Sequence, residues 1–277
     1  MRTIPFIISL LLTAVPVFGQ ETVRGRIVNE QGEAVEYVQV GIPKLQLGTI
    51  STADGRFEIS VPKDTLEFFH VSYQTGRHIV TGPEDDVVVV LHENELQPAV
   101  FTDGNTRQKY LIRPGTKVAG NGGLLVFEPM TGNTKGTEIG SVAKTQKPFL
   151  VRDIQFSIWQ NSIPDCVASV NIYRIEKDDV FINVLQRPIY VNVAESDKPQ
   201  EFHIQPDETL LLEPGKYFIA FQIVDWNAKA LEERASLSTI LYFKSSYTRK
   251  AALGKMEPYP FNIGMVVKGL EYRQANK

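Results

Sequence analysis

Cysteine, histidine and long apolar runs are scarce in this chain of 277 residues. Cys166 is the only cysteine, so an intrachain disulfide is excluded, and its place at the start of an apolar strand predicts a buried, inert thiol. The four histidines lack the spacing of metal ligands, and we expect no metal site. They are His70, His78, His92 and His203. No pattern of catalytic or cofactor-binding residues stands out either, so we expect neither an enzyme nor a cofactor.

The main apolar run is confined to the N-terminus. Ile4–Phe18 follows a single positive residue, Arg2, and small residues stand at Val17 and Gly19. This order is typical of a signal peptide, here residues 1–19, and the run is shorter than the about 20 residues that a membrane-spanning helix needs. No cysteine for lipidation follows it. We expect an exported protein that does not span a membrane and whose mature chain begins at Gln20.

The chain also lacks a large excess of either positive or negative charge. The chain has 29 Lys and Arg against 32 Asp and Glu, a net charge of −3, and the basic residues are dispersed. Such a chain has no electrostatic reason to bind nucleic acid. Hydrophobic residues make up 43%, which is enough for folded cores.

What the chain does have is an ordered series of strand and turn signals from Val23 to Pro62. Val23, Gly25 and Ile27 alternate with arginines, as in a half-buried strand. Asp54-Gly55 separates two alternating runs and predicts a hairpin with a type I′ turn. Further signals are Asn29, Gly32, Tyr37, Val38, Val40, Ile42, Gly48, Thr49, Ser51, Thr52 and Phe57, with a weaker group at His70, Val71, Ser72 and Tyr73.

This series resembles the carboxypeptidase regulatory-like domain, a small prealbumin-like sandwich that precedes the plug of many Bacteroidetes TonB-dependent receptors. The resemblance implies a β-sandwich and a place in the cell envelope, in the periplasm or associated with the outer membrane. A weaker resemblance, at Gly140-Ser141, Lys147 to Phe156, Val170 to Tyr173 and Pro214 to Ala220, is to envelope proteins that carry this domain without a receptor barrel. It implies an architecture and no activity.

The remaining length predicts two units. Residues 22–93 form the regulatory-like sandwich, which we expect to end with Val87–Leu91 as a fully buried strand. Residues 94–108 are polar and form the predicted linker. Residues 109–277 form a second unit, which begins with long loops around one strand, Leu124–Phe127.

The alternation of apolar and polar residues predicts that the second unit is all-β. Ile154, Phe156 and Ile158 share one face of a strand, and Asn227–Arg234 is the only helical segment. The expected strands are Arg152–Gln160, Val167–Ile175, Phe181–Val193, Glu201–Ile204, Lys216–Trp226, Ser238–Lys244 and Phe261–Lys268. About seven strands at this spacing indicate a sandwich or jelly roll. The predicted fold is therefore all-β, a prealbumin-like β-sandwich followed by a second β-sandwich or jelly-roll domain.

Two functions remain open. The first is a non-catalytic envelope protein that docks to a protein partner. The alternative is a glycan-binding accessory protein of a polysaccharide-utilisation system, since aromatic faces stack on sugars. Trp226, at a strand end, and Tyr247, in a long connection, are the candidate ligand-binding residues, with Trp159 next. An exposed aromatic cluster would favour glycan binding, whereas an apolar patch or an unpaired edge strand would favour docking.

Overall fold

The computed structural model describes residues 20–95, 105–113, 115–118, 123–129 and 135–272. Almost all regular structure in them is β, which confirms the predicted all-β class. The exceptions are the one-turn helix α1 (Lys229–Glu232), which lies within the expected helical segment, and short 3-10 turns. The predicted signal peptide, 1–19, lies outside the described residues, as does most of the predicted linker.

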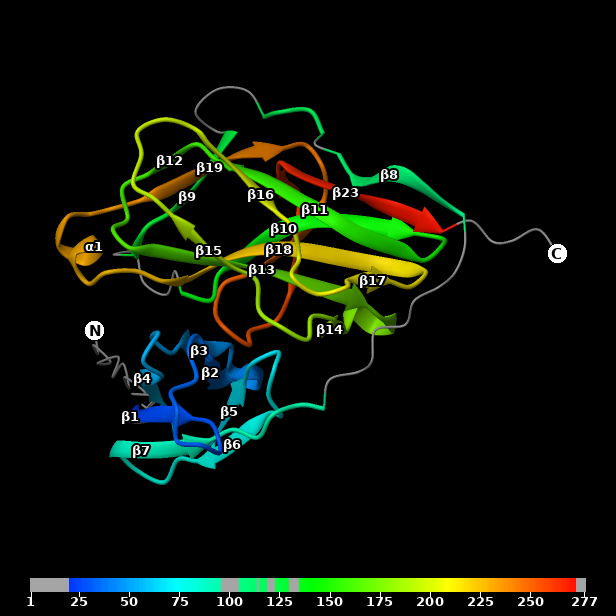
Figure 1. Ribbon diagram of the computed structural model, residues 1–277. Helices are drawn as coiled ribbons and strands as arrows, with labels where there is room; N and C mark the ends of the chain where they lie inside the picture. The colour runs from blue at the N-terminus through cyan, green and yellow to red at the C-terminus, as the bar shows by residue number, and fades with distance from the viewer. Residues whose placement is uncertain (1–19, 96–104, 114, 119–122, 130–134, 273–277) are drawn as a thin grey trace, which may run out of the picture.

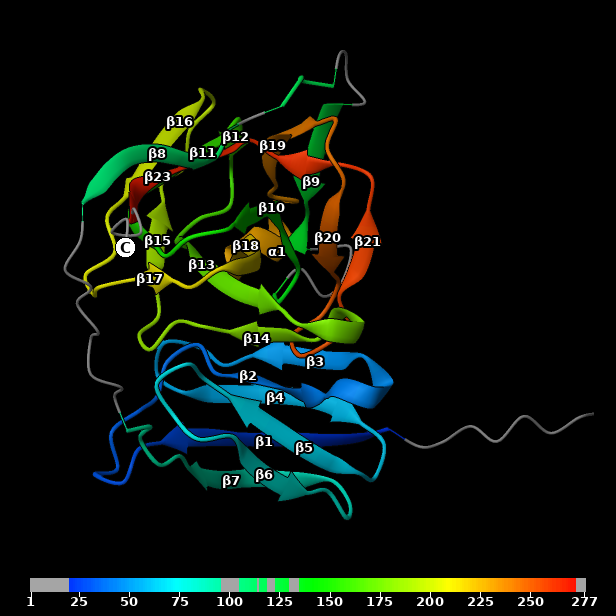
Figure 2. The ribbon, with the colours of Figure 1, turned by 90° about the vertical axis from the view of Figure 1, so that its right-hand side faces the viewer.

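The N-terminal residues form a two-layer sandwich (Figure 2). One layer has the order β4-β1-β7, with β1 parallel to β7. The other has the order β3-β2-β5-β6. The strands are β1 (Glu21–Val28), β2 (Gln39–Ile42), β3 (Leu47–Ile50), β4 (Arg56–Val61), β5 (Thr65–Phe69), β6 (Gly76–Ile79) and β7 (Glu84–Val90). Alternation explains the packing, because the inward residues of β4, Phe57, Ile59 and Val61, are buried and the residues between them are exposed.

Two predictions for this sandwich were wrong. The valine run is the edge strand β7 and is only half buried, because Val88 and Val90 point outward and are 66% and 46% exposed. The turn at Asp54-Gly55 is not type I′, since only Gly55 (φ 76°) has a positive φ. The Gly55 amide donates to the Thr52 carbonyl and Thr52 pairs with Arg56, which makes a three-residue loop with glycine in the left-handed region.

The later residues form larger, curled sheets above the first sandwich (Figure 1). Their main strands are β8 (Thr106–Ile112), β9 (Leu124–Phe127), β10 (Glu138–Thr145), β11 (Phe149–Ile158), β13 (Cys166–Ile175), β14 (Phe181–Asn183), β15 (Tyr190–Val193), β16 (Gln200–Ile204), β18 (Gly215–Asp225), β19 (Leu237–Tyr242) and β23 (Met265–Tyr272). Short strands complete the sheets: β12 (Gln160–Asn161), β17 (Leu211–Leu212), β20 (Ser246–Arg249), β21 (Glu257–Tyr259) and β22 (Asn262–Ile263).

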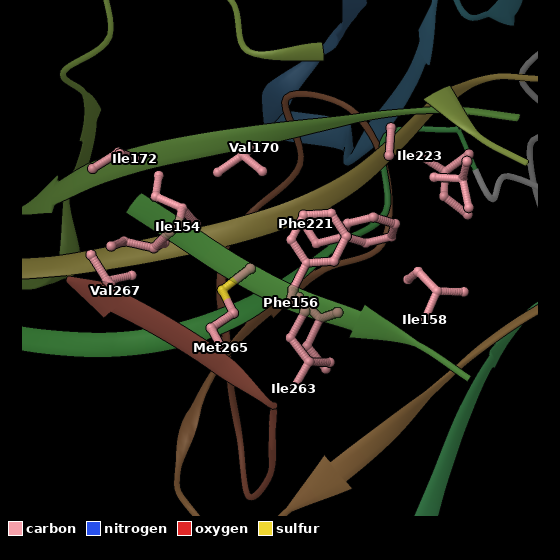
Figure 3. Packing of buried hydrophobic residues seen from close by; sticks show 14 of the residues in the cluster. Ile154, Phe156, Ile158, Val170, Ile172, Phe221, Ile223, Ile263, Met265 and Val267 are labelled. Atoms are coloured by element: carbon pink, nitrogen blue, oxygen red, sulfur yellow. The ribbon is translucent and has the colours of Figure 1, made fainter. Parts of the chain in front are cut away.

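The core of this second sandwich contains the predicted face of β11. Ile154, Phe156 and Ile158 are buried, and the Phe156 ring lies 5.3 Å from that of Phe221 on β18, with Met265 beside them (Figure 3). The strand predicted at Leu124–Phe127 is confirmed as β9. The single strand predicted over 181–193 was wrong, because the chain forms β14 and then β15, both paired with β13. Strand β8 begins at Thr106, inside the range predicted as linker and loops.

Candidate functional site at the junction of the two sandwiches

The two sandwiches meet along a packed junction. Ile50 at the end of β3 is buried with Val224 and Ala252 of the second sandwich. The rings of Tyr37 and Tyr190 meet edge to face at 4.9 Å across the same boundary. Gly48 lies so close to the backbone of Ala252 that a side chain there would meet the Ala252 carbonyl oxygen.

A buried polar network lies behind this contact. The Glu138 carboxylate is fully buried and sits 2.8 Å from the Arg249 guanidinium. Tyr173 and Asn171 donate to Glu138 Oε1 at 2.8 and 2.6 Å. Arg249 also donates to Gln39 Oε1 of the first sandwich at 3.2 Å. Burial raises the pKa of the Glu138 carboxyl, and the adjacent guanidinium acts against that rise.

A second polar contact crosses the junction at His70, which is 8% exposed. The Ser72 amide donates to His70 Nδ1 at 3.2 Å, and His70 Nε2 lies 3.2 Å from the Tyr190 hydroxyl. A neutral ring that accepts at Nδ1 carries its proton on Nε2, so His70 donates to Tyr190. Burial lowers the pKa of His70 to about 4. The histidine is therefore a structural hydrogen-bonding group of the junction at neutral pH.

One side of the junction opens into a groove of about 1090 Å³. It runs over the outward face of the β4-β1-β7 sheet and reaches the second sandwich at the end of β18 and the start of α1. The charged residues that line it are Arg24, Arg26, Arg56, Glu58, Asp85, Asp86, Lys135 and Asp225, and the larger apolar ones are Ile50, Phe57, Val87, Val88, Trp226 and Leu231.

Most of these charges are paired within the chain. Arg24 lies 3.0 Å from Glu58 and 3.1 Å from Asp85. Lys135 lies 2.6 Å from Asp225. Arg26 and Arg56 stand directly opposite each other on the antiparallel strands β1 and β4. The groove therefore contains one pair of facing like charges, beside paired neighbours and Asp86, which has no ion pair among the described residues.

The structure does not bring the two predicted ligand-binding residues together. Trp226 borders the groove and packs against the core of the second sandwich, with the Lys135 ammonium 5.0 Å from its ring centroid. Tyr247 lies in a separate cluster, where its ring is 4.9 Å from that of Phe181. The Lys216 ammonium lies 5.2 Å from the Tyr247 ring, and the hydroxyl donates to Asp179.

Trp159 is 44% exposed directly after β11 and does not line the groove over the β4-β1-β7 sheet. No single cluster of exposed aromatic side chains joins the three predicted residues. The site residues that sequence analysis missed are Arg26, Arg56 and Val88. Their outward direction follows from the alternation along the strands, but the pairing of β1 with both β4 and β7 is a long-range feature.

In the part of the chain that the structure covers, no group of three potential metal ligands occurs. Cys166 is buried, as predicted, and burial raises the pKa of its thiol to about 12, so it is not a ready nucleophile. No helix among these same residues is long and apolar enough to cross a membrane.

Comparisons with known proteins give only distant structural likenesses. No protein-family model matches the sequence, and no curated protein is significantly similar to it. A DUF3823 family protein from Parabacteroides merdae aligns over 88% of this chain and 98% of its own, at 8% identity and a TM-score of 0.23. One from Bacteroides ovatus aligns over 74% and 97%, at 10% identity and a TM-score of 0.22.

An infectious bursal disease virus structure aligns over 80% of this chain and 46% of its own, at 9% identity and a TM-score of 0.30. The chain is thus structurally similar, at low TM-scores, to β-rich DUF3823 proteins of Bacteroidetes. Scores of this size carry no argument about function.

Proposed function

We propose that this chain is an exported, non-catalytic protein of the bacterial cell envelope that docks to a protein partner through its first sandwich. The observation that carries the proposal is the edge strand β7, whose outward Val88 and Val90 are 66% and 46% exposed. Ile79 on β6, the edge strand of the other layer, is 69% exposed. Both strands are the last in their sheets and lie together on the side of the sandwich away from the second one (Figures 1 and 2).

Exposed edge strands with outward β-branched side chains are normally protected, because they invite pairing with another chain. Among the described residues β7 pairs only with β1, and its outward valines have no covering element. A partner that covers them would remove apolar surface from water and satisfy the strand edge. The resemblance of residues 22–93 to the carboxypeptidase regulatory-like domain supports a place in the periplasm or at the outer membrane.

Glycan binding at Trp226 and Tyr247, the alternative, has weaker support. The two residues belong to different clusters, and a lysine ammonium lies over each ring. A sugar would need a free aromatic face at the same place.

The test of docking is site-specific photo-crosslinking in cells that produce the protein naturally. A photoreactive amino acid at Val88 or Val90 should give one discrete adduct that contains a second envelope protein. The same group at Val126, which is also exposed (48%) but lies on β9, serves as the control. Adducts of equal yield and composition at all three positions, or none at Val88 and Val90, would refute docking on this edge.

A further inference from the structure

On the outward face of the β4-β1-β7 sheet, two arginines and a valine stand side by side on neighbouring strands. Arg56 on β4 faces Arg26 on β1, and Arg26 faces Val88 on β7. Like charges directly opposite each other on neighbouring strands are destabilising. The two arginines contribute an Arg56–Asp54 ion pair and a hydrogen bond from Arg26 to the Asp54 carbonyl oxygen, but their facing charges do not stabilise the sheet, which makes the row a candidate for recognition.

Of the two arginines in this row, Arg26 is the one without an ion pair among the described residues. Arg56 pairs with Asp54 at 2.8 Å, within its own turn. Arg26 donates only to the carbonyl oxygen of Asp54, at 3.4 Å, and has no carboxylate within ion-pair distance among the described residues. The acids Glu58, Asp85, Asp86 and Asp225 also line the groove, and Glu58, Asp85 and Asp225 are matched by Arg24 and Lys135.

We propose that Arg26 and Arg56 together bind a carboxylate of an acidic segment in a partner protein, with Val88 covered by an apolar side chain beside that carboxylate. The inference rests on the proposed docking function and names the chemistry of the partner. A guanidinium presents a planar fork of donors that matches a carboxylate, and a shared anion relieves the repulsion between the two arginines.

The apolar flanks favour a peptide over an acidic polysaccharide. Val88 and Leu231 are 66% and 47% exposed on the two walls of the groove, and peptide side chains can bury both. A sugar chain would instead need an aromatic platform, and the Trp226 ring is occupied by Lys135 and the core.

The test uses the full chain and a capped synthetic peptide of alternating glutamate and valine. We expect saturable shifts of the Arg26 and Arg56 Nε–Hε NMR signals and no shift of Arg77, which lies on β6 beside Glu67. Arg26→Gln should weaken binding about ten-fold, as expected for one lost charge-assisted pair. Arg77→Gln, which removes the same charge from the same sandwich, should change affinity less than two-fold, and Arg26→Lys should restore part of the loss.

Equal weakening by Arg26→Gln and Arg77→Gln, or no shift at Arg26, would overturn the inference. So would tight binding of polygalacturonate at these signals without binding of the peptide, because the ligand would then be an acidic glycan. Circular dichroism of each variant excludes misfolding. Failure of the peptide together with a discrete crosslink at Val88 would refute the acidic segment and leave docking intact, whereas loss of the crosslink refutes docking itself.

Discussion

The junction between the two sandwiches has a closed side, where charged side chains are buried and paired, and an open side, where charged side chains face water in the groove. On the closed side, Glu138 and Arg249 are buried as an ion pair with hydrogen-bonding partners from both sandwiches, and of the buried atoms of these two groups only Glu138 Oε2 and Arg249 Nε make no hydrogen bond among the described residues. On the open side, Arg26 and Arg56 face each other at the surface, and no carboxylate pairs with Arg26 among the described residues. The closed side is built mainly from β10, β13 and β20 of the second sandwich, with Gln39 of the first, whereas the open side is built from β1 and β4 of the first.

This difference separates residues that hold the molecule together from residues that are available to a partner. A buried charge without a partner is costly, so the closed side has to be satisfied within the chain. An exposed arginine is satisfied by water, so the open side tolerates an unmatched charge at little cost. Substitutions on the closed side should therefore affect folding, and those on the open side should affect binding.

The largest expected effect follows from breaking the buried ion pair. Arg249→Met leaves the fully buried Glu138 carboxyl with Tyr173 and Asn171 only, and should lower the free energy of unfolding by about 3–5 kcal/mol. Urea denaturation measures the loss. The double variant Glu138→Gln, Arg249→Met should be less destabilised than the single one, since no charge is stranded. A loss below about 1 kcal/mol would mean that the network does not hold the junction.

The next effect is a dependence of stability on pH. Because burial lowers the pKa of His70 to about 4, the unfolded state binds a proton between pH 6.5 and 4 while the folded state does not. The contribution of His70 to the free energy of unfolding is fully present above pH 6.5 and decreases as the pH falls. At pH 4 it is smaller by about 3 kcal/mol. His70→Gln should remove this part of the slope in urea denaturation at pH 7 and pH 4.5. If the pH dependence of stability were the same in His70→Gln as in the wild type, His70 would not be its source.

A smaller effect concerns the turn that holds Arg56 and Asp54 at the open side. Gly55 has φ of 76°, and a Cβ there would lie 2.5 Å from the Ile27 carbonyl oxygen. Gly55→Val should therefore destabilise the protein by about 1–3 kcal/mol. Gly82, which has open space around it and no positive φ, supplies the control Gly82→Val. Equal thermal midpoints for the two variants would show that the strained backbone costs nothing.

Sequence periodicity predicted the local features well. The inward face of Ile154, Phe156 and Ile158, the strand Leu124–Phe127 and the buried Cys166 depend on alternation within one segment, and the structure confirms them. The turn at Gly55 was predicted with the correct glycine and the wrong type, because Asp-Gly suits more than one loop geometry.

Features that depend on pairing between distant segments could not be predicted. Val87–Leu91 has the composition of a strand buried on both faces, and Val88 and Val90 are exposed because the described residues leave the outward face of the β4-β1-β7 sheet uncovered there. Trp226 and Tyr247 are both flanked by polar residues, yet the fold places them in separate clusters under Lys135 and Lys216. The facing arginines arise from the register of β1 on β4, which no local pattern specifies.

The smallest expected effect tests that register directly. If Arg26 and Arg56 repel each other, Arg26→Gln should raise the free energy of unfolding by about 0.2–1 kcal/mol at low salt, the range for one cross-strand pair. The gain should shrink as added salt screens the charges. In the Arg56→Gln background the same substitution should give no gain, which separates pairwise repulsion from a general effect of net charge. A stability loss from Arg26→Gln in the wild-type background would show that the row of arginines serves the fold, and the open side would then no longer differ from the closed one.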